Sequence, residues 1–227
     1  MAAFELLLKS ISHTPIAILD ERIPISSYVT IDLSSKNPEL LQFDITNPNS
    51  CQAYIDQVLK LKEGQVAYGG YLEERNLYSD KENFAQTVFP RNIHLGIDFW
   101  CIAGTKVLAP VTGTVHSFKN NDTKGDYGPT IVLKHKIDDI DFFTLYGHLS
   151  LGSIKSLTIG KKIDKGTILG TLGTPDINVN YAPHLHFQII KDLENNFGDY
   201  PGVCNIKDLD FYRGNCPNPD LLLKNIG

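Results

Sequence analysis

The stretch "HLGIDFWCIAGTKVLAPVTGTV", residues 94–115, is the most informative part of the sequence. It places His94 and Asp98 on either side of Gly96, immediately before a run whose apolar residues alternate as in a β-strand. Positions i and i+4 share a face in a helix, but Gly96 and the β-branched Ile97 disfavour helix here. In a straight strand four residues span about 13 Å, too far for two side chains to bind one ion through bonds of about 2 Å. Either the pair is unrelated, or the backbone bends at Gly96.

The composition is that of an ordinary globular protein. The 227 residues suffice for one well-buried domain with elaborations, or for two small ones. Hydrophobic residues make up 42% and charged residues 21% of the chain, unlike a disordered protein. The net charge is -5 and the basic residues do not cluster, so we expect no nucleic-acid partner. No apolar run approaches the roughly 18 residues of a membrane span, so we expect no membrane partner.

The amino terminus and the cysteines bear on the compartment. The segment 1–15 has a short apolar patch interrupted by charges and lacks a signal-peptide pattern, which predicts a cytoplasmic protein as written. If a leader has been removed, the expected location is the periplasm or cell wall. The cysteines show no C-x-x-C pairing, which argues against zinc–thiolate sites. Cys204 and Cys216 could form a disulfide in an oxidising compartment, but we expect buried or free thiols.

The chain divides into two regions. Residues 1–85 form an amino-terminal elaboration with short strand candidates at 15–19, 27–33 and the start of 65–78, and a polar connection at 79–84. A helix is predicted over about 50–63, with Asn49 or Ser50 as its cap, an apolar stripe facing the core and Gly64 at its end. Residues 86–227 are β-rich with a turn-rich carboxy-terminal extension. Their strand candidates are 106–110, 112–118, 130–136, 141–148, 167–173 and 184–190.

These elements predict a mainly β fold, α+β overall. We expect two packed antiparallel sheets that form a groove, with a small α/β elaboration at the amino terminus. The oligomeric state is not predicted.

The segment "YAPHLHFQII", residues 181–190, is the second informative stretch. Side chains alternate along a strand, so His184 and His186 point to one face while Leu185 and Phe187 point to the other. A single strand histidine is ordinarily a hydrogen-bonded structural residue. Two at i and i+2, between a proline and an apolar strand, indicate a functional surface.

A third motif, "TLYGHLS", ends a strand at His148, where Gly147 lets the backbone approach a neighbour closely. Histidines and an aspartate are the kind of set that zinc favours. Two imidazoles and one carboxylate leave an open tetrahedral position for water, which the metal acidifies. The candidate residues are His94, Asp98, His148, His184 and His186.

The succession "HLGID", "YGHLS" and "HLH" resembles the lysostaphin and LytM-type zinc metallopeptidases, which mostly cut peptide cross-links of bacterial peptidoglycan. The resemblance runs from about Arg91 to Ile190 and includes "APVTGTV", "IGKKIDKGTILGTLG" and "PHLHFQI". It implies a lysostaphin/LytM-like fold with a duplicated hybrid motif. It also implies one Zn²⁺ per chain and a peptidoglycan peptide or another small peptide as substrate.

By this resemblance His94, Asp98 and His186 are the zinc ligands, and the bend at Gly96 brings the first two together. His148 and His184 would face the open position as catalytic residues. A water activated by zinc would attack an amide carbonyl. One histidine would take the proton, and the other or the metal would stabilise the oxyanion. Which histidine has which role stays open.

The sequence departs from the family pattern at three points. The approach to the "HLH" motif is an altered loop at 174–183, with Gln188 in place of the usual acid after it, and Pro129 stands where asparagine is common. The third departure is that no export signal is seen at the amino terminus. We therefore keep two alternatives: a non-catalytic binding or regulatory module, and a cytosolic metallohydrolase with another substrate. A biotinyl- or lipoyl-type carrier is disfavoured, because no lysine lies at the required hairpin.

Several further residues carry open interpretations. His13, His116 and His135 are expected to be surface or strand residues. Tyr127 and Tyr146 could line the groove or pack in the core, as could Trp100. An asparagine in the loops 120–128 or 174–183 could cover the zinc as a fourth ligand.

Overall fold

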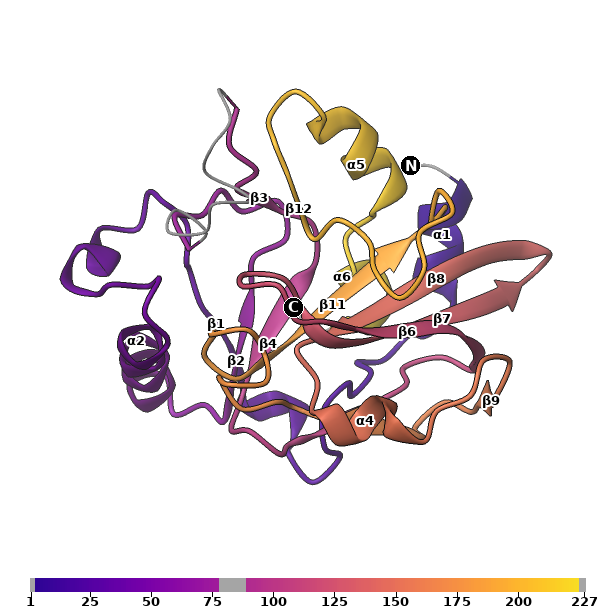
Figure 1. The fold of residues 1–227 in the computed structure, drawn as a ribbon, viewed down its shortest axis with the longest axis horizontal. Coiled ribbons are helices and arrows are strands. Elements are labelled where there is room, and N and C mark those ends of the chain that lie inside the picture. The colour runs from indigo at the N-terminus through magenta and orange to yellow at the C-terminus, as the bar shows by residue number, and fades with distance from the viewer. Residues whose placement is uncertain (1–2, 78–88, 225–227) are drawn as a thin grey trace.

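The computed structural model describes residues 3–77 and 89–224, and its largest element is an eight-stranded sheet (Figure 1). All neighbouring strands pair antiparallel except β1 and β2, which are parallel. In spatial order the strands are β1 (Tyr28–Thr30), β2 (Val66–Gly69), β4 (Ile97–Trp100), β11 (His184–Ile190), β8 (Ile140–Gly147), β7 (Gly128–Ile137), β6 (Gly113–Asn121) and β9 (Lys162–Ile163).

Two small antiparallel sheets accompany the large one. β5 (Lys106–Leu108) pairs with β10 (Ile168–Thr171), and β3 (Ile93–His94) pairs with β12 (Val203–Cys204). Val107 of β5 shares one apolar core with Phe187 of the large sheet. The prediction of a mainly β fold with packed sheets is confirmed. The sheets are unequal, and the large one is mixed because the chain returns from β1 to β2 through a helix, as a parallel pair requires.

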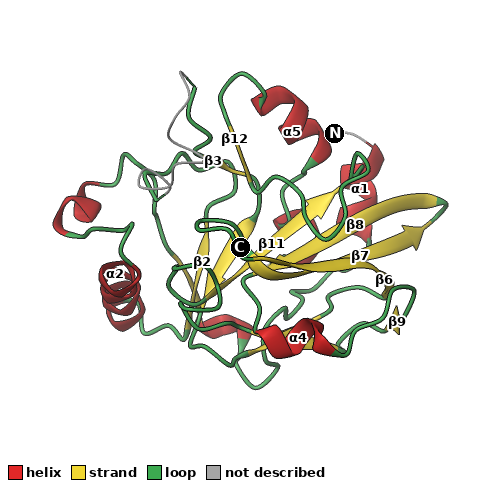
Figure 2. Ribbon diagram, in the orientation of Figure 1, coloured by secondary structure: helices red, strands yellow, loops and turns green. Residues whose placement is uncertain are grey.

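The helices lie around the sheet (Figure 2). They are α1 (Ala3–Ser10), α2 (Pro48–Leu61), α4 (Leu151–Lys155), α5 (Leu209–Asn215) and α6 (Asp220–Leu223), with short 3-10 turns at Ile25–Ser27 and Pro38–Gln42. α2 is the helix predicted over 50–63, shifted by two residues. The shift has a physical cause at the start: the Asn47 side chain, and not Asn49 or Ser50, accepts the first free N–H groups, and Pro48 occupies the first turn.

Both described chain ends help to close the main core. In α1 the apolar residues Phe4, Leu7 and Leu8 share one face and are buried. They join a cluster that includes Leu223 of α6, whose carbonyl accepts the N–H of Ile16. The carboxy-terminal extension is thus helical in part, beyond the turns that the sequence predicts. The strand predicted at 15–19 does not form: the segment packs in the main core and pairs through an isolated bridge between Leu19 and Val107.

The central strand β11 is buried along its whole length. Leu185, Phe187 and Ile189 face the main core, while the alternate residues face the opposite side. The alternation predicted for the "HLH" strand is therefore present, and it places the two histidines on one surface. Among the described residues, no helix has the length and apolar character needed to cross a membrane. The predicted polar connection at 79–84 lies outside the described residues.

Candidate metal centre and groove

The backbone breaks between His94 and Asp98, as the spacing of the motif requires. β3 ends at His94 and pairs with β12, whereas β4 begins at Ile97 and pairs with β11. The His94 Nε2 and Asp98 Oδ1 atoms consequently lie 3.2 Å apart. Gly96 lets the segment pack closely against β11, because a Cβ at this position would lie 2.6 Å from the carbonyl oxygen of Phe187 and 2.8 Å from the His186 ring.

The register of β11 assembles the remaining residues. His186 lies opposite Asp98 on β4 and opposite Gly147 on β8. Opposed residues of neighbouring strands point to the same face, so the carboxylate and the imidazole meet directly. His148 follows Gly147 and leaves the strand with a φ of 61°, a left-handed conformation that redirects the chain. His184 lies two residues before His186, on the same face.

Three ligand atoms converge on one point. His94 Nε2 lies 2.8 Å from His186 Nδ1, and His186 Nδ1 lies 3.1 Å from Asp98 Oδ1. Zinc bonds of about 2.0–2.1 Å at tetrahedral angles place ligand atoms roughly 3.3 Å apart. The three side chains are buried and form a group able to hold a metal ion. Their chemistry and spacing therefore fit zinc.

Hydrogen bonds on the outer side of the site place the proton of both His94 and His186 on the nitrogen that faces away from Asp98. The Gln188 Nε2 group donates to the carbonyl of Pro201, so the amide oxygen must face His186 Nε2, at 2.9 Å. His186 thus carries its proton on Nε2. The His94 Nδ1–H donates to the carbonyl of Gly70 at 2.9 Å. Both inner nitrogens then present lone pairs to the Asp98 carboxylate, an arrangement that a cation between them would stabilise.

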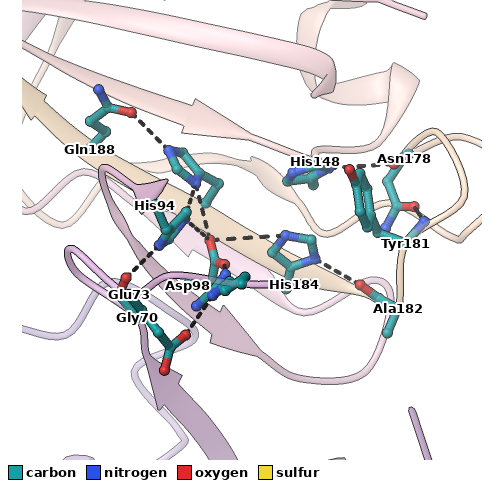
Figure 3. A network of polar contacts seen from close by, with 12 residues as sticks. Gly70, Glu73, His94, Asp98, His148, Asn178, Tyr181, Ala182, His184 and Gln188 are labelled. Atoms are coloured by element: carbon teal, nitrogen blue, oxygen red, sulfur yellow. Dashed lines mark hydrogen bonds and ion pairs between the residues drawn. The ribbon is translucent and has the colours of Figure 1, made fainter. Parts of the chain in front are cut away.

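His184 and His148 lie beside the three ligands (Figure 3). The His184 Nδ1–H donates to the carbonyl of Ala182 at 2.7 Å, and its Nε2 lies 4.0 Å from Asp98 Oδ1. The ring centroids of His148 and His184 are 4.1 Å apart, and His148 Nδ1 lies 3.4 Å from the Asn178 carbonyl oxygen. The structure therefore brings together all five residues that the sequence predicts for the site.

Burial controls the charge of these groups. It holds the pKa of His148 well below the ordinary value, and the neighbouring His184 lowers that pKa further. Burial likewise lowers the pKa of His184, and it lowers that of His94 to about 4 with the help of Arg75. Burial alone would raise the pKa of Asp98, but His94 and Arg75 outweigh it and keep that pKa well below its usual range. Neutral imidazoles and an ionised carboxylate are the forms that bind a metal.

The site opens into a groove of about 370 Å³. Near the ligands, Tyr127 and Tyr181 flank His148, with ring centroids 5.7 and 5.3 Å from its own. Asp126 and Asp199 also line the groove. Burial and the charge of Asp199 raise the pKa of Asp126 to about 6.

Sequence reasoning missed Arg75, Gly70 and the hydrogen-bonding role of Gln188. Arg75 Nη1 donates to Asp98 Oδ2 at 2.6 Å, and its side chain is fully buried. A single arginine in a polar stretch is ordinarily a surface residue, and no motif in the sequence relates it to Asp98. Gly70 gives one faint signal: the "YGGY" pair marks a close backbone approach, and the φ at Gly70 is 99°.

The structure also places the aromatic residues and the histidines whose roles the sequence left open. Trp100 is a core residue: it is buried, its ring stacks on that of His184 with centroids 5.6 Å apart, and it is not among the residues that line the groove. Tyr146 is a core residue, whereas Tyr127 lines the groove. His13 is exposed, and His135 is a buried strand residue that bonds to Thr112 and Thr144.

The cysteines and the two loops complete the comparison with the sequence. All four cysteines are free thiols, which confirms the preferred interpretation of Cys204 and Cys216. In the loop 174–183, Asn178 uses its side-chain oxygen to accept the N–H of Tyr181 and its carbonyl to contact His148. An asparagine as fourth ligand stays a prediction, and the Asn178 oxygen is already engaged.

Comparison with known proteins agrees with this geometry. Residues 92–197 match the model of "Peptidase family M23". Over 95 residues the chain is 33% identical to an "Uncharacterized metalloprotease" of Haemophilus influenzae. That alignment covers 42% of this chain and only 18% of the relative.

Two of the similar solved structures are catalytic domains that overlap this chain in part. The chain is 24% identical to the catalytic domain of the antimicrobial peptidase lysostaphin from Staphylococcus simulans, with a TM-score of 0.37 over 54% of this chain and 80% of that one. It is 23% identical to a mutant catalytic domain of the prophage-encoded M23 protein EnpA from Enterococcus faecalis, with a TM-score of 0.39 over 56% and 77%. The family match over residues 92–197 spans both histidine motifs and the aspartate that completes the ligand group.

Proposed function

We propose that this chain is a zinc metalloendopeptidase that hydrolyses amide bonds in peptidoglycan cross-links or in related short peptides. The observation that carries the proposal is the convergence of His94, Asp98 and His186 at the floor of a groove that also presents two further histidines. The family match supports peptide hydrolysis. Peptidoglycan as substrate would place the working protein in the periplasm or cell wall, and a cytoplasmic protein would act on another short peptide.

His94 Nε2, Asp98 Oδ1 and His186 Nδ1 would hold one zinc ion. When bound, zinc acidifies a water molecule and polarises the carbonyl of the scissile amide. The outer nitrogens of both imidazoles are hydrogen-bonded to Gly70 and Gln188, so the rings cannot rotate away from the ligand position. This preorganisation spares the protein a rearrangement when the metal enters.

His148 and His184 are the candidates for proton transfer. Burial lowers the pKa of each, so both are neutral near pH 7. The Nδ1–H of His184 is held by Ala182, which leaves its Nε2 lone pair free to accept the proton of the attacking water. The imidazolium formed can then donate to the developing oxyanion or deliver the proton to the leaving amine. The close second ring supplies the partner for this exchange.

The groove fits an extended peptide. Its walls combine the Tyr127 and Tyr181 rings with the glycines at 125 and 202, so an unbranched backbone can approach the ligand group closely. The centroid of the Tyr127 ring lies 5.1 Å from that of His186. The ring fits there because residue 147 is a glycine: a Cβ at this position would lie 2.7 Å from the Tyr127 ring. Small or glycine-containing peptides are the substrate class that such a narrow floor favours.

The test is digestion of purified sacculi and a panel of muropeptides by the zinc-loaded protein, with mass spectrometry of new amino termini. His148→Asn is the inactive control and the exposed His13→Asn the matched histidine control. We expect cleavage by the unaltered protein and by His13→Asn, and none by His148→Asn. A zinc-loaded protein that releases no amino terminus from sacculi, muropeptides or glycine-containing peptides would overturn the proposal.

A further inference from the structure

Arg75 lies outside the residues that match the family, yet it contacts the candidate ligand Asp98. Its side chain is fully buried, and Nη1 donates to Asp98 Oδ2 at 2.6 Å. A charge-assisted hydrogen bond of this length is strong, especially where water is excluded. The contact spans 23 positions of sequence and joins the amino-terminal region to the metal centre.

The two oxygens of Asp98 are divided between two tasks. Oδ1 faces His94 Nε2 at 3.2 Å and His186 Nδ1 at 3.1 Å, whereas Oδ2 is held by Arg75. A free carboxylate can bind a metal through one oxygen or both. With Oδ2 bound to the guanidinium, only Oδ1 is available to the ion.

Arg75 is itself fixed from two sides. Its Nε donates to Glu73 Oε2 at 2.5 Å, and Glu73 Oε1 accepts the backbone N–H of Leu33 at 3.1 Å. The guanidinium also lies 5.5 Å from the centroid of the Trp100 ring, which stacks on His184. The arginine is therefore a rigid support and not a loosely placed surface charge.

Gly70 links this support to the second ligand. Its carbonyl accepts the Nδ1–H of His94, and a Cβ at this position would lie 1.7 Å from Arg75 Nη2. The turn between Gly70 and Arg75 thus fixes the tautomer of His94 and the orientation of the Asp98 carboxylate. Both contacts come from residues that precede the family match.

We propose that Arg75 is a positioning residue of the metal centre: it restricts Asp98 to one-oxygen coordination and so keeps a coordination position open for water. The inference rests on the proposed zinc site. A two-oxygen carboxylate would add a ligand atom to the ion and occupy the position that the attacking water needs. The amino-terminal region is on this account a working part of the centre.

The test replaces zinc by cobalt and compares Arg75→Gln and Arg75→Lys with the unaltered chain. Cobalt with four ligands absorbs visible light several times more strongly than cobalt with five, so its spectrum reports the coordination of Asp98 without substrate. Arg22→Gln is the control, because Arg22 also pairs with an aspartate, Asp20, but its side chain is 77% exposed. Zinc affinity is measured by competition with a chelator, and folding by near-ultraviolet circular dichroism.

We expect Arg75→Gln to weaken zinc binding by about 10- to 100-fold and to reduce the visible absorption of the cobalt form. Arg75→Lys keeps a buried cation beside Asp98 and Glu73 and should fold even if Arg75→Gln does not. It should show the same change to a smaller extent. Unchanged spectra and affinities in folded Arg75 variants would overturn the inference and leave the proposed function standing. An unaltered chain that binds neither zinc nor cobalt would overturn both.

Discussion

The ring centroids of His148 and His184 lie 4.1 Å apart, although the first residue follows β8 and the second begins β11. Two imidazoles this close cannot both become charged without strong repulsion, and His184 lowers the pKa of His148 further below the value that burial sets. A proton accepted by one is therefore readily released. In the reaction that we propose, the pair would pass a proton from the attacking water to the leaving amine.

Replacing His148 should separate turnover from metal binding. His148 adopts a φ of 61°, which asparagine tolerates better than alanine does, so His148→Asn is the cleaner variant. We expect it to retain one zinc per chain and to lose about 10²- to 10⁴-fold in kcat. Zinc content by atomic spectroscopy and peptide cleavage on the same sample check this, and loss of zinc would show that His148 is a ligand.

Replacing Asp98 should abolish stoichiometric zinc. Asp98→Ala would leave the buried Arg75 facing a hole, so Asp98→Asn, which keeps an acceptor for the guanidinium, is preferred. We expect zinc to be lost on dialysis, because an amide oxygen is a poor substitute for an anionic ligand. Asp164→Asn, at an exposed surface pair with Lys162, is the control. Full retention of zinc by folded Asp98→Asn would contradict the ligand assignment.

Gln188 should control the tautomer of His186. Gln188→Leu removes the acceptor of the Nε2–H and also leaves the carbonyl of Pro201 without its donor. We expect zinc affinity to fall by about 10- to 100-fold. Gln188→Glu keeps the acceptor but loses the same donor to Pro201, so it isolates the effect of the acceptor, and it should bind zinc more tightly than Gln188→Leu. Equal affinities in all three proteins, measured by chelator competition, would exclude this role.

Asp126 should make stability depend on pH. Its pKa is raised to about 6 in the folded protein, from 3.8, by burial and by Asp199. The stability that its protonated form contributes is thus fully present below pH 4 and is lost as the pH rises through 6. Asp126→Asn should melt at the same temperature as the unaltered chain near pH 4 and about 2 °C higher at pH 8. Thermal unfolding at both pH values tests this, and a constant difference would refute it.

Gly96→Ala should damage both the fold and the metal site. The added methyl group would press on the carbonyl of Phe187 and on the ring of His186. Overpacking of this kind costs about 1–3 kcal/mol and should lower the melting temperature by about 3–10 °C. Gly214→Ala has open space and serves as the matched control. Equal melting temperatures and zinc affinities in the two variants would mean that β11 can shift to make room.

The parts of the site that the sequence reveals are those with local spacing. His184 and His186 alternate with Leu185 and Phe187 on one strand, so their shared face follows from period-two geometry. His94 and Asp98 required a bend, and Gly96 was its only local signal.

What the sequence does not reveal depends on contacts between distant residues. Arg75 lies 23 positions before Asp98 in the sequence, and it also contacts the Trp100 ring. Neither contact follows from the periodic spacing of residues within one helix or strand. α2 begins two residues earlier than predicted because Asn47 caps it and Pro48 occupies its first turn. The apolar stripe, from which the start was predicted, does not extend to these residues. The fold class does not depend on these details, because it rests on the six strand candidates between residues 106 and 190, and strands β5 to β8, β10 and β11 form there.

The turn from Gly70 to Arg75 also bears on how this protein can be dissected. A fragment trimmed to residues 92–197, the natural choice for recombinant expression of the peptidase block, would contain all five histidine and aspartate side chains of the site. It would lack the carbonyl that orients His94, the guanidinium that holds Asp98 and the strand β2 that covers the edge of β4. Such a fragment would expose an unpaired strand edge prone to aggregation. The smallest autonomous unit is therefore larger than the region of sequence similarity.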